Sequence, residues 1–144
     1  MKLENIFAEW EKDSKINRED LGSESLNTAS LHHKYHKIYT YERIQLRNFE
    51  LQLKTLRLDK FEFYTQGPTK ETVEKGWKLP PIGKVLKADA NTYVDADKDV
   101  IDLTLKIGIQ HEKIDLLSSI IKTLANRGFN INTAVNWLKY TSGG

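Results

Sequence analysis

The chain has 144 residues with 22 Lys and Arg, 20 Asp and Glu and a formal net charge of +2, a size that fits a single domain. It has no cysteine, which excludes disulfides, thiolate metal sites and a cysteine nucleophile. Its apolar runs are shorter than the roughly 18 residues that span a bilayer, and its start lacks the apolar segment of a signal peptide. We therefore expect a soluble intracellular protein without a membrane partner.

The positive charge is concentrated in the middle of the chain. Residues 1–30 hold four Lys and Arg against seven Asp and Glu, residues 31–87 hold twelve against six, and residues 88–144 hold six against seven. A basic middle segment of this kind favours a polyanion as partner.

The first thirty residues form an acidic, helical N-terminal segment in the predicted fold. Apolar residues at helical spacing predict an amphipathic helix over residues 3–14. Asn17 and Asp20 predict the start of a short second helix. Gly22 and Ser23 predict a break, with the next helix beginning near Ser30.

A long basic helix is predicted over residues 31–66, ending at Gln66-Gly67-Pro68. From Leu31 to Tyr64 it would measure about 51 Å, against a radius of gyration of about 15 Å for a compact chain of this length, so we expect an elongated subunit. One face carries the main buried stripe: Tyr35, Ile38, Tyr39, Leu46, Phe49, Leu53, Leu56 and Phe63. A second apolar line, Ile44, Leu51 and Leu58, lies on roughly the opposite side, which predicts more than one packing neighbour.

Residues 67–83 are predicted to form a loop, and residues 84–144 to form the C-terminal oligomerisation helices. The strongest pattern is a four-heptad seam typical of coiled coils. Its members are Val100, Leu103, Ile107, Gln110, Ile114, Leu117, Ile121 and Leu124, with Gln110 as a polar interruption that could fix the register. An intramolecular helical hairpin is the alternative. A second apolar set, Ile101, Leu105, Ile109, Leu116 and Ile120, covers another face.

Gly128 predicts a left-handed stop to that helix, followed by a short terminal helix that contains Trp137. The predicted fold class is therefore all-α. The predicted subunit is elongated, has a coiled-coil-like C-terminal helix and assembles as a ring-like homo-oligomer.

A basic stripe on the long helix is the first candidate binding site. His36, Arg43, Arg47 and Lys54 fall within about 40° of one another at 100° per residue, along about 27 Å of helix. Cations spaced in this way could engage several phosphates of a nucleic acid. The alternative is a solvated helix face with ion pairs.

The end of the same helix adds aromatic residues to the charge. Arg57, Lys60 and Tyr64 are candidates for phosphate contacts and base stacking, whereas Phe63 is better explained as a core residue. In the following loop, Trp77 and Lys78 could close on a strand. A buried structural tryptophan explains Trp77 equally well.

The sequence gives little support for metal, cofactor or enzyme chemistry. His32 and His36 are one helical turn apart, but no nearby Asp, Glu or Cys completes a metal site. The acidic run from Asp95 to Asp102 lacks the Gly and Glu that a calcium loop requires. Phosphate-binding loops and nucleophile signatures are also missing. We expect no catalytic residue, no metal and no cofactor.

Five segments, in order, resemble a known family. They are Trp10-Glu11-Lys12-Asp13-Ser14, Leu31-His32-His33-Lys34-Tyr35, Leu56-Arg57-Leu58-Asp59-Lys60 leading to Phe63-Tyr64-Thr65-Gln66-Gly67, Asp95-Ala96-Asp97-Lys98-Asp99-Val100, and Asn126-Arg127-Gly128-Phe129-Asn130-Ile131. In these segments the chain is similar to the UvsY-type recombination mediators of T-even-like bacteriophages.

The resemblance implies an accessory factor that binds single-stranded DNA and acts in the cytoplasm of the infected bacterial host. It also implies contacts with a single-strand-binding protein and a RecA-like recombinase, which is loaded as the former is displaced. DNA binding in the family maps to Lys54, Arg57, Lys60 and Tyr64. Oligomerisation, as a hexamer or heptamer, maps to the C-terminal region. The alternative function is a structural coiled-coil assembly or chaperone-like protein without nucleic-acid binding.

Overall fold

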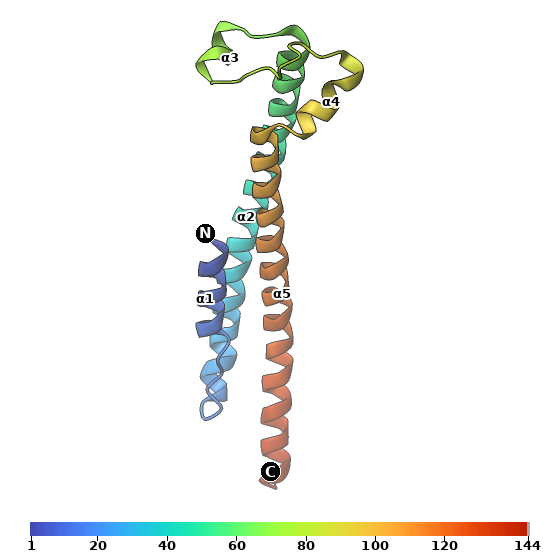
Figure 1. Cartoon of the computed structure of the whole chain (residues 1–144). Coiled ribbons are helices and arrows are strands. Elements are labelled where there is room, and N and C mark those ends of the chain that lie inside the picture. Colours follow the sequence, from blue (N-terminus) through green and yellow to red (C-terminus); the bar gives the residue numbers. More distant parts are fainter. Residues whose placement is uncertain (144) are drawn as a thin grey trace. The chain divides into compact units, whose positions relative to one another are not determined.

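The structure is a computed structural model that describes residues 1–143, and in this range it is all-helical. Its helices are α1 (Leu3–Asp13), α2 (Leu21–Gln66), α3 (Lys70–Glu74), α4 (Lys87–Asp95) and α5 (Lys98–Thr141) (Figure 1). The all-α fold class predicted from the sequence is therefore confirmed.

The chain forms two compact units. Unit 1 comprises residues 1–45 and 109–144, and unit 2 comprises residues 46–108. The helices α2 and α5 each contribute one part to unit 1 and another part to unit 2.

Unit 1 has its core among α1, the first part of α2 and the second part of α5. Figure 1 shows α1 alongside that part of α2. The buried cluster consists of Ile6, Leu31, Tyr35, Leu117, Ile120 and Leu124. Trp10 meets Tyr35 edge to face with ring centroids 5.5 Å apart. The Tyr35 hydroxyl donates to Asp13 Oδ2 at 2.8 Å, so the largest fully buried side chain of this core has its polar atom satisfied.

A buried polar contact also joins α2 and α5 within unit 1. Gln110 Nε2 donates to the Glu42 backbone oxygen at 2.7 Å and to Glu42 Oε2 at 2.6 Å. The N-terminal amine of Met1 lies 3.0 Å from Glu42 Oε1. Burial raises the pKa of Glu42, but the hydrogen bonds from Gln110 and the Met1 amine outweigh it, so the pKa lies below its ordinary value. The polar member of the heptad seam thus has its hydrogen-bond partner inside the same chain.

Replacing Gln110 by alanine is expected to lower the free energy of unfolding by about 1–3 kcal/mol, because the buried Glu42 loses a hydrogen-bond donor. Urea unfolding followed by circular dichroism measures this change. Ser119, farther along α5, is exposed, and its replacement by alanine is the control. An unchanged unfolding midpoint for Gln110→Ala would show that the contact contributes nothing to stability.

The predicted helix stop at Gly128 is wrong, because α5 continues through it to Thr141. Gly128 is not among the glycines with positive φ. Leu124, Arg127 and Ile131 follow one another at helical spacing and all are buried. The Arg127 guanidinium donates to the backbone oxygens of Asp13 and Lys15, each at 3.0 Å. The helix therefore keeps partners on both sides of Gly128, and the predicted separate terminal helix is part of α5.

The predicted start of the long helix near Ser30 is also wrong, since α2 begins at Leu21. The Asp20 side chain accepts a hydrogen bond from the backbone nitrogen of Ser23 at 3.2 Å, so Asp20 caps the first turn. Gly22 and Ser23 lie in that turn, where backbone amides have no helical partner in any case. Residues that predict a break are tolerated there.

Unit 2 has its core where the end of α2 meets α4 and the start of α5. The buried cluster consists of Phe63, Tyr64, Val85, Ala90, Val94 and Val100. Gly67, with φ of 95°, ends α2 as predicted, and its amide donates to the Phe63 oxygen at 2.9 Å. The returning chain is joined to α2 by the Val85 amide, which donates to the Tyr64 oxygen at 2.9 Å.

The segment predicted as a loop over residues 67–83 contains the short helix α3. Thr69 caps it, with Thr72 completing a capping box, a local pattern that stabilises the first turn. Helix resumes at Lys87 rather than near Lys84, and α4 and α5 are separated at Ala96-Asp97.

The heptad seam of α5 packs within the chain. Leu117 and Leu124 are in the core of unit 1, and Val100 is in the core of unit 2. Leu103, Ile107, Ile114 and Ile121 are half-buried. The intramolecular alternative therefore describes these residues better than an intermolecular coiled coil. Val100, Leu117 and Leu124, which are covered within the chain, are poor candidates for the oligomer surface, whereas the four half-buried side chains keep part of their surface exposed.

Candidate nucleic-acid interface

A groove lined by basic and apolar side chains lies along α2 in unit 2. Arg47, Lys54 and Arg57 line it together with Glu50. The apolar part of the lining is Leu51, Leu53 and Ile107, and the groove has a volume of about 590 Å³. Arg47 and Lys54 are exposed, at positions seven apart on the helix. Two turns of α-helix place such side chains about 10.5 Å apart, which is about three times the 3.4 Å axial repeat of phosphates on one strand of a duplex.

Arg57 differs from the other two cations because it has a carboxylate partner. Its Nη2 lies 2.8 Å from Asp95 Oδ1, and both side chains are substantially exposed. An exposed pair of this kind contributes little to stability. A phosphate could therefore exchange with Asp95 at low cost, so Arg57 stays a candidate contact.

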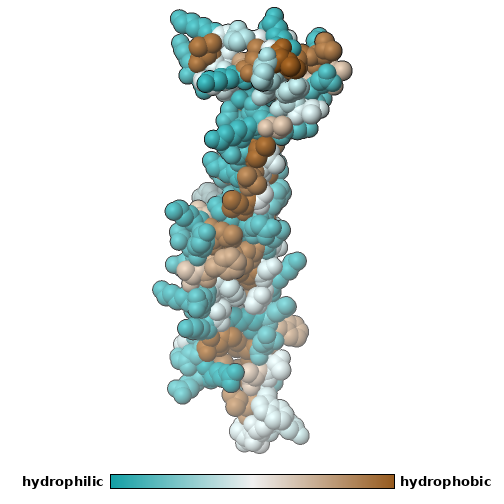
Figure 2. Space-filling view, in the orientation of Figure 1, coloured by the Kyte–Doolittle hydropathy of each residue, from teal (hydrophilic) through white to brown (hydrophobic). Residues whose placement is uncertain are grey.

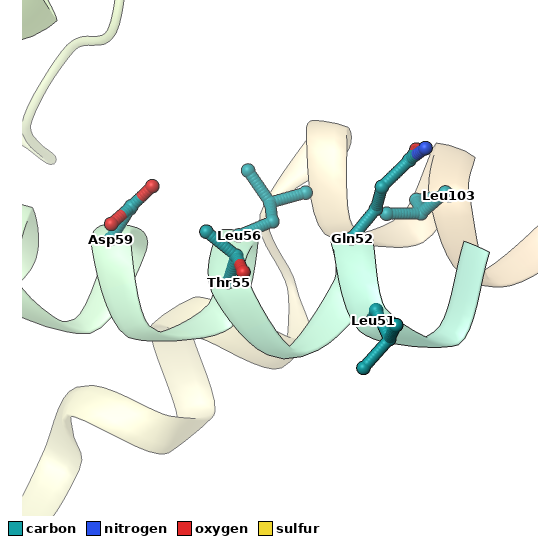
Figure 3. Close-up of a pocket in the computed structure, with 6 residues that line it drawn as sticks. All are labelled: Leu51, Gln52, Thr55, Leu56, Asp59 and Leu103. Atoms are coloured by element: carbon teal, nitrogen blue, oxygen red, sulfur yellow. The ribbon is translucent and has the colours of Figure 1, made fainter. Parts of the chain in front are cut away.

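A second groove in unit 2 has the opposite character. Figure 3 shows its lining, in which Leu51, Gln52, Thr55, Leu56 and Asp59 come from α2 and Leu103 comes from α5. Its ionisable residue is Asp59, which does not favour a polyanion. Leu51 lines both grooves and is 61% exposed. Of these two grooves, only the basic one suits a nucleic-acid backbone.

Lys60 and Tyr64, both predicted DNA contacts, lie in the interior of unit 2. Lys60 has a relative exposure of 3% and Tyr64 of 8%. Lys60 Nζ lies 3.1 Å from Asp97 Oδ2 and 2.8 Å from Asp99 Oδ2. The Tyr64 hydroxyl donates to Asp97 Oδ2 at 2.6 Å. The prediction that Lys60 and Tyr64 contact DNA is therefore corrected, because both polar groups are paired with carboxylates and covered by protein. We do not include either residue in the proposed interface.

Asp97 is the centre of this buried network. Its Oδ1 also accepts hydrogen bonds from the amides of Asp99 at 2.9 Å and Val100 at 3.3 Å, which cap the start of α5. Burial raises the pKa of Asp97, but the hydrogen bonds from Tyr64 and Lys60 outweigh it and hold the pKa below its ordinary value. For Tyr64, burial and the hydrogen bond to Asp97 both raise the pKa.

The lowered pKa of Asp97 predicts a loss of stability in acid. Its contribution is fully present above the ordinary carboxyl pKa of about 3.9 and is lost as the pH falls through the lower pKa of the folded state. The difference in unfolding free energy between wild type and Asp97→Asn, measured in urea, should therefore shrink below about pH 4. An equal difference at pH 7 and pH 3 would contradict this assignment.

Trp77 and Lys78 have different surroundings. Trp77 is half-buried, with its ring centroid 5.5 Å from that of Phe63 and 3.8 Å from Lys60 Nζ. These contacts favour the structural alternative for Trp77, since one face of its indole is already covered by Lys60. Lys78 is exposed and keeps its predicted role as a candidate contact.

The two remaining predicted contacts, His36 and Arg43, belong to the part of α2 in unit 1, and both are exposed. The Arg43 guanidinium lies 5.4 Å from the centroid of the Tyr39 ring. Tyr39 was not predicted as a functional residue, because its spacing placed it in the buried stripe. The signal that could have indicated it is its position four residues before Arg43 on one helix face.

Taken as a class, this is a protein whose described residues are all-helical and include a groove lined by three cations, one carboxylate and apolar side chains. Positively charged grooves that follow the backbone are typical of proteins that bind single-stranded nucleic acid. No helix within residues 1–143 has the length and apolar character needed to cross a membrane.

Comparison with known proteins identifies the family. The model of the UvsY family, described as recombination, repair and ssDNA binding protein UvsY, matches residues 9–144. The chain therefore belongs to the UvsY family. Among curated proteins, none matched the chain significantly.

Solved structures agree with the fold. A crystal structure of the bacteriophage T4 recombination mediator protein UvsY, lattice type II, is similar with a TM-score of 0.81 and 21% identity over 100% of this chain and 99% of that chain. The lattice type I structure gives 0.80 and 20% over 95% and 98%. At this identity the likeness establishes the shared helical fold.

Proposed function

We propose that this protein is a single-stranded DNA-binding recombination mediator that loads a RecA-like recombinase onto DNA covered by single-strand-binding protein. The observation that carries the proposal is the exposed basic groove of Arg47, Lys54 and Arg57 in a member of a recombination, repair and ssDNA-binding family. Its lysine and arginine side chains would release counterions from the phosphates, which makes binding largely independent of sequence.

The proposed active form is a ring-like homo-oligomer, a hexamer or heptamer, in the cytoplasm of the infected bacterial host. Exposed apolar side chains in each unit support assembly. In unit 2 they include Leu51, Leu58, Ile101 and Leu105, and in unit 1 they include Leu26, Phe129, Trp137, Leu138 and Tyr140. Figure 2 shows brown, apolar surface between teal, hydrophilic surface on the face in view. Repetition of weak DNA contacts around such an oligomer would give high avidity.

In this mechanism, wrapping of the strand on the oligomer competes with the single-strand-binding protein. The recombinase then nucleates on the strand that is released. Both partner proteins would be held near the DNA by contacts with the oligomer, and those contacts raise the effective concentration of the recombinase.

The test measures recombinase assembly on oligo-dT that is already covered by single-strand-binding protein. The wild type is expected to shorten the lag before assembly, and Arg47→Ala/Lys54→Ala should lengthen it again. A wild type that binds DNA but leaves the lag unchanged would contradict the loading step. Sedimentation velocity of the same samples tests the ring, for which a monomer at working concentration is the contrary result.

A further inference from the structure

An ion pair connects the basic groove of unit 2 to helix α4. Arg57 lines the groove from α2, and its Nη2 lies 2.8 Å from Oδ1 of Asp95, the last residue of α4. The Arg57 side chain is 39% exposed and the Asp95 side chain 63%. Solvent therefore reaches both partners, and the guanidinium faces a carboxylate at the place where the groove would present it to a phosphate.

Asp95 and Asp97 are close in sequence but have different surroundings. Asp97 is buried, pairs with Lys60 and accepts backbone amides at the start of α5. Asp95 is exposed at the C-terminal end of α4, where the helix dipole makes a negative charge unfavourable. Arg57 supplies a compensating positive charge there. Asp97 is thus bound into the fold, whereas Asp95 interacts with a cation of the candidate DNA site.

A carboxylate and a phosphate compete for the same guanidinium. The planar fork of an arginine suits both groups, because each presents oxygen atoms that accept parallel N–H bonds. An exposed ion pair is weak and is screened by salt, so it can be exchanged for a phosphate contact. The exchange still has a cost, since Asp95 loses its partner whenever Arg57 turns to a phosphate.

We propose that Asp95 is an intramolecular competitor of the DNA phosphate for Arg57 and thereby limits the affinity of the basic groove. This inference rests on the proposed function and adds a residue that weakens DNA binding to those that support it. Asp95 is a positioning residue, because it acts through Arg57 and does not itself contact DNA. A strand held against such a competitor is released more easily, which suits a protein that passes its DNA to a recombinase.

The test is a double-mutant cycle on the affinity for labelled oligo-dT at 0.1 M salt, measured by fluorescence anisotropy. Asp95→Asn removes the competing charge and should raise the affinity about two- to fivefold, the range expected from the strength of an exposed ion pair. In an Arg57→Ala background the same substitution should leave the affinity nearly unchanged, because the cation that Asp95 withholds is already gone.

Asp89→Asn is the matched control for charge. Asp89 is exposed in the first turn of α4 and does not line the groove, so its replacement removes the same charge and should leave the affinity nearly unchanged. An equal gain from Asp89→Asn, or an equal gain from Asp95→Asn without Arg57, would show a general electrostatic effect and overturn the proposal.

Unfolding in urea separates competition from a structural role of the ion pair. Asp95→Asn should not lower the unfolding midpoint, because it relieves an unfavourable charge at the end of α4. A lower midpoint without any gain in affinity would make Asp95 a structural residue and overturn the proposal. A folded wild type that does not bind oligo-dT even at low salt would instead contradict the proposed function itself.

Discussion

Replacing both Arg47 and Lys54 by alanine is expected to weaken binding to single-stranded DNA about 25-fold at 0.1 M salt. Each phosphate contact contributes a slope of about −0.7 in a plot of log affinity against log salt concentration, which is about fivefold in affinity at 0.1 M. The double variant should therefore also lose about 1.4 from the slope. Fluorescence anisotropy of labelled oligo-dT at several salt concentrations measures both quantities.

The matched control for this experiment removes two positive charges elsewhere. Lys122 and Lys139 are exposed on the part of α5 in unit 1 and do not line the basic groove. Lys122→Ala/Lys139→Ala changes the net charge by the same amount, so a general electrostatic effect would affect both variants alike. Equal losses in affinity and slope would show that the groove has no special role.

Replacing Lys60 by methionine is expected to cost about 3–5 kcal/mol of unfolding free energy. The substitution leaves the buried Asp97 carboxylate without its cation, and breaking a buried pair by removing one partner is strongly destabilising. Lys60 Nζ also lies over the Trp77 ring. In a Trp10→Phe/Trp137→Phe background Trp77 is the remaining tryptophan of the chain, so its fluorescence reports on the surroundings of Lys60. Lys54→Met, at an exposed site on the same helix, should change stability by at most about 0.5 kcal/mol.

This variant also separates a structural role for Lys60 from a role in DNA binding. If the role of Lys60 is structural, the folded fraction of the Lys60→Met variant should show the wild-type slope of log DNA affinity against log salt concentration. Unchanged stability together with a reduced slope would return Lys60 to the DNA interface. Lys60 would then have to exchange the carboxylates of Asp97 and Asp99 for a phosphate, although its ammonium group is buried.

Much of the fold follows from local patterns in the sequence. The apolar spacing of α1, the end of α2 at Gly67 and the core position of Phe63 are each set by helix periodicity or turn chemistry, and the structure confirms them. The errors at Gly22 and Gly128 have a different origin. At Gly128 tertiary contacts outweigh the local signal, because the buried Arg127 and Ile131 hold α5 on either side of the glycine.

The candidate site could be predicted less completely from the sequence than the fold. Lys54, Arg57 and Lys60 are equally spaced and chemically alike, yet only Lys60 is buried, because Asp97 and Asp99 lie against it from a distant part of the chain. The heptad seam has the same ambiguity, since a pattern of apolar residues does not state whether the partner helix is in the same chain. Tertiary contacts decide both questions.

Competition between single-stranded and duplex DNA tests the central claim most directly. Wild-type protein is titrated into labelled oligo-dT at low and moderate salt, and unlabelled duplex of equal length is then added. We predict salt-sensitive binding that a large excess of duplex does not displace. No binding at low salt by folded protein would contradict the mediator function and would favour a structural helical assembly that does not bind nucleic acid.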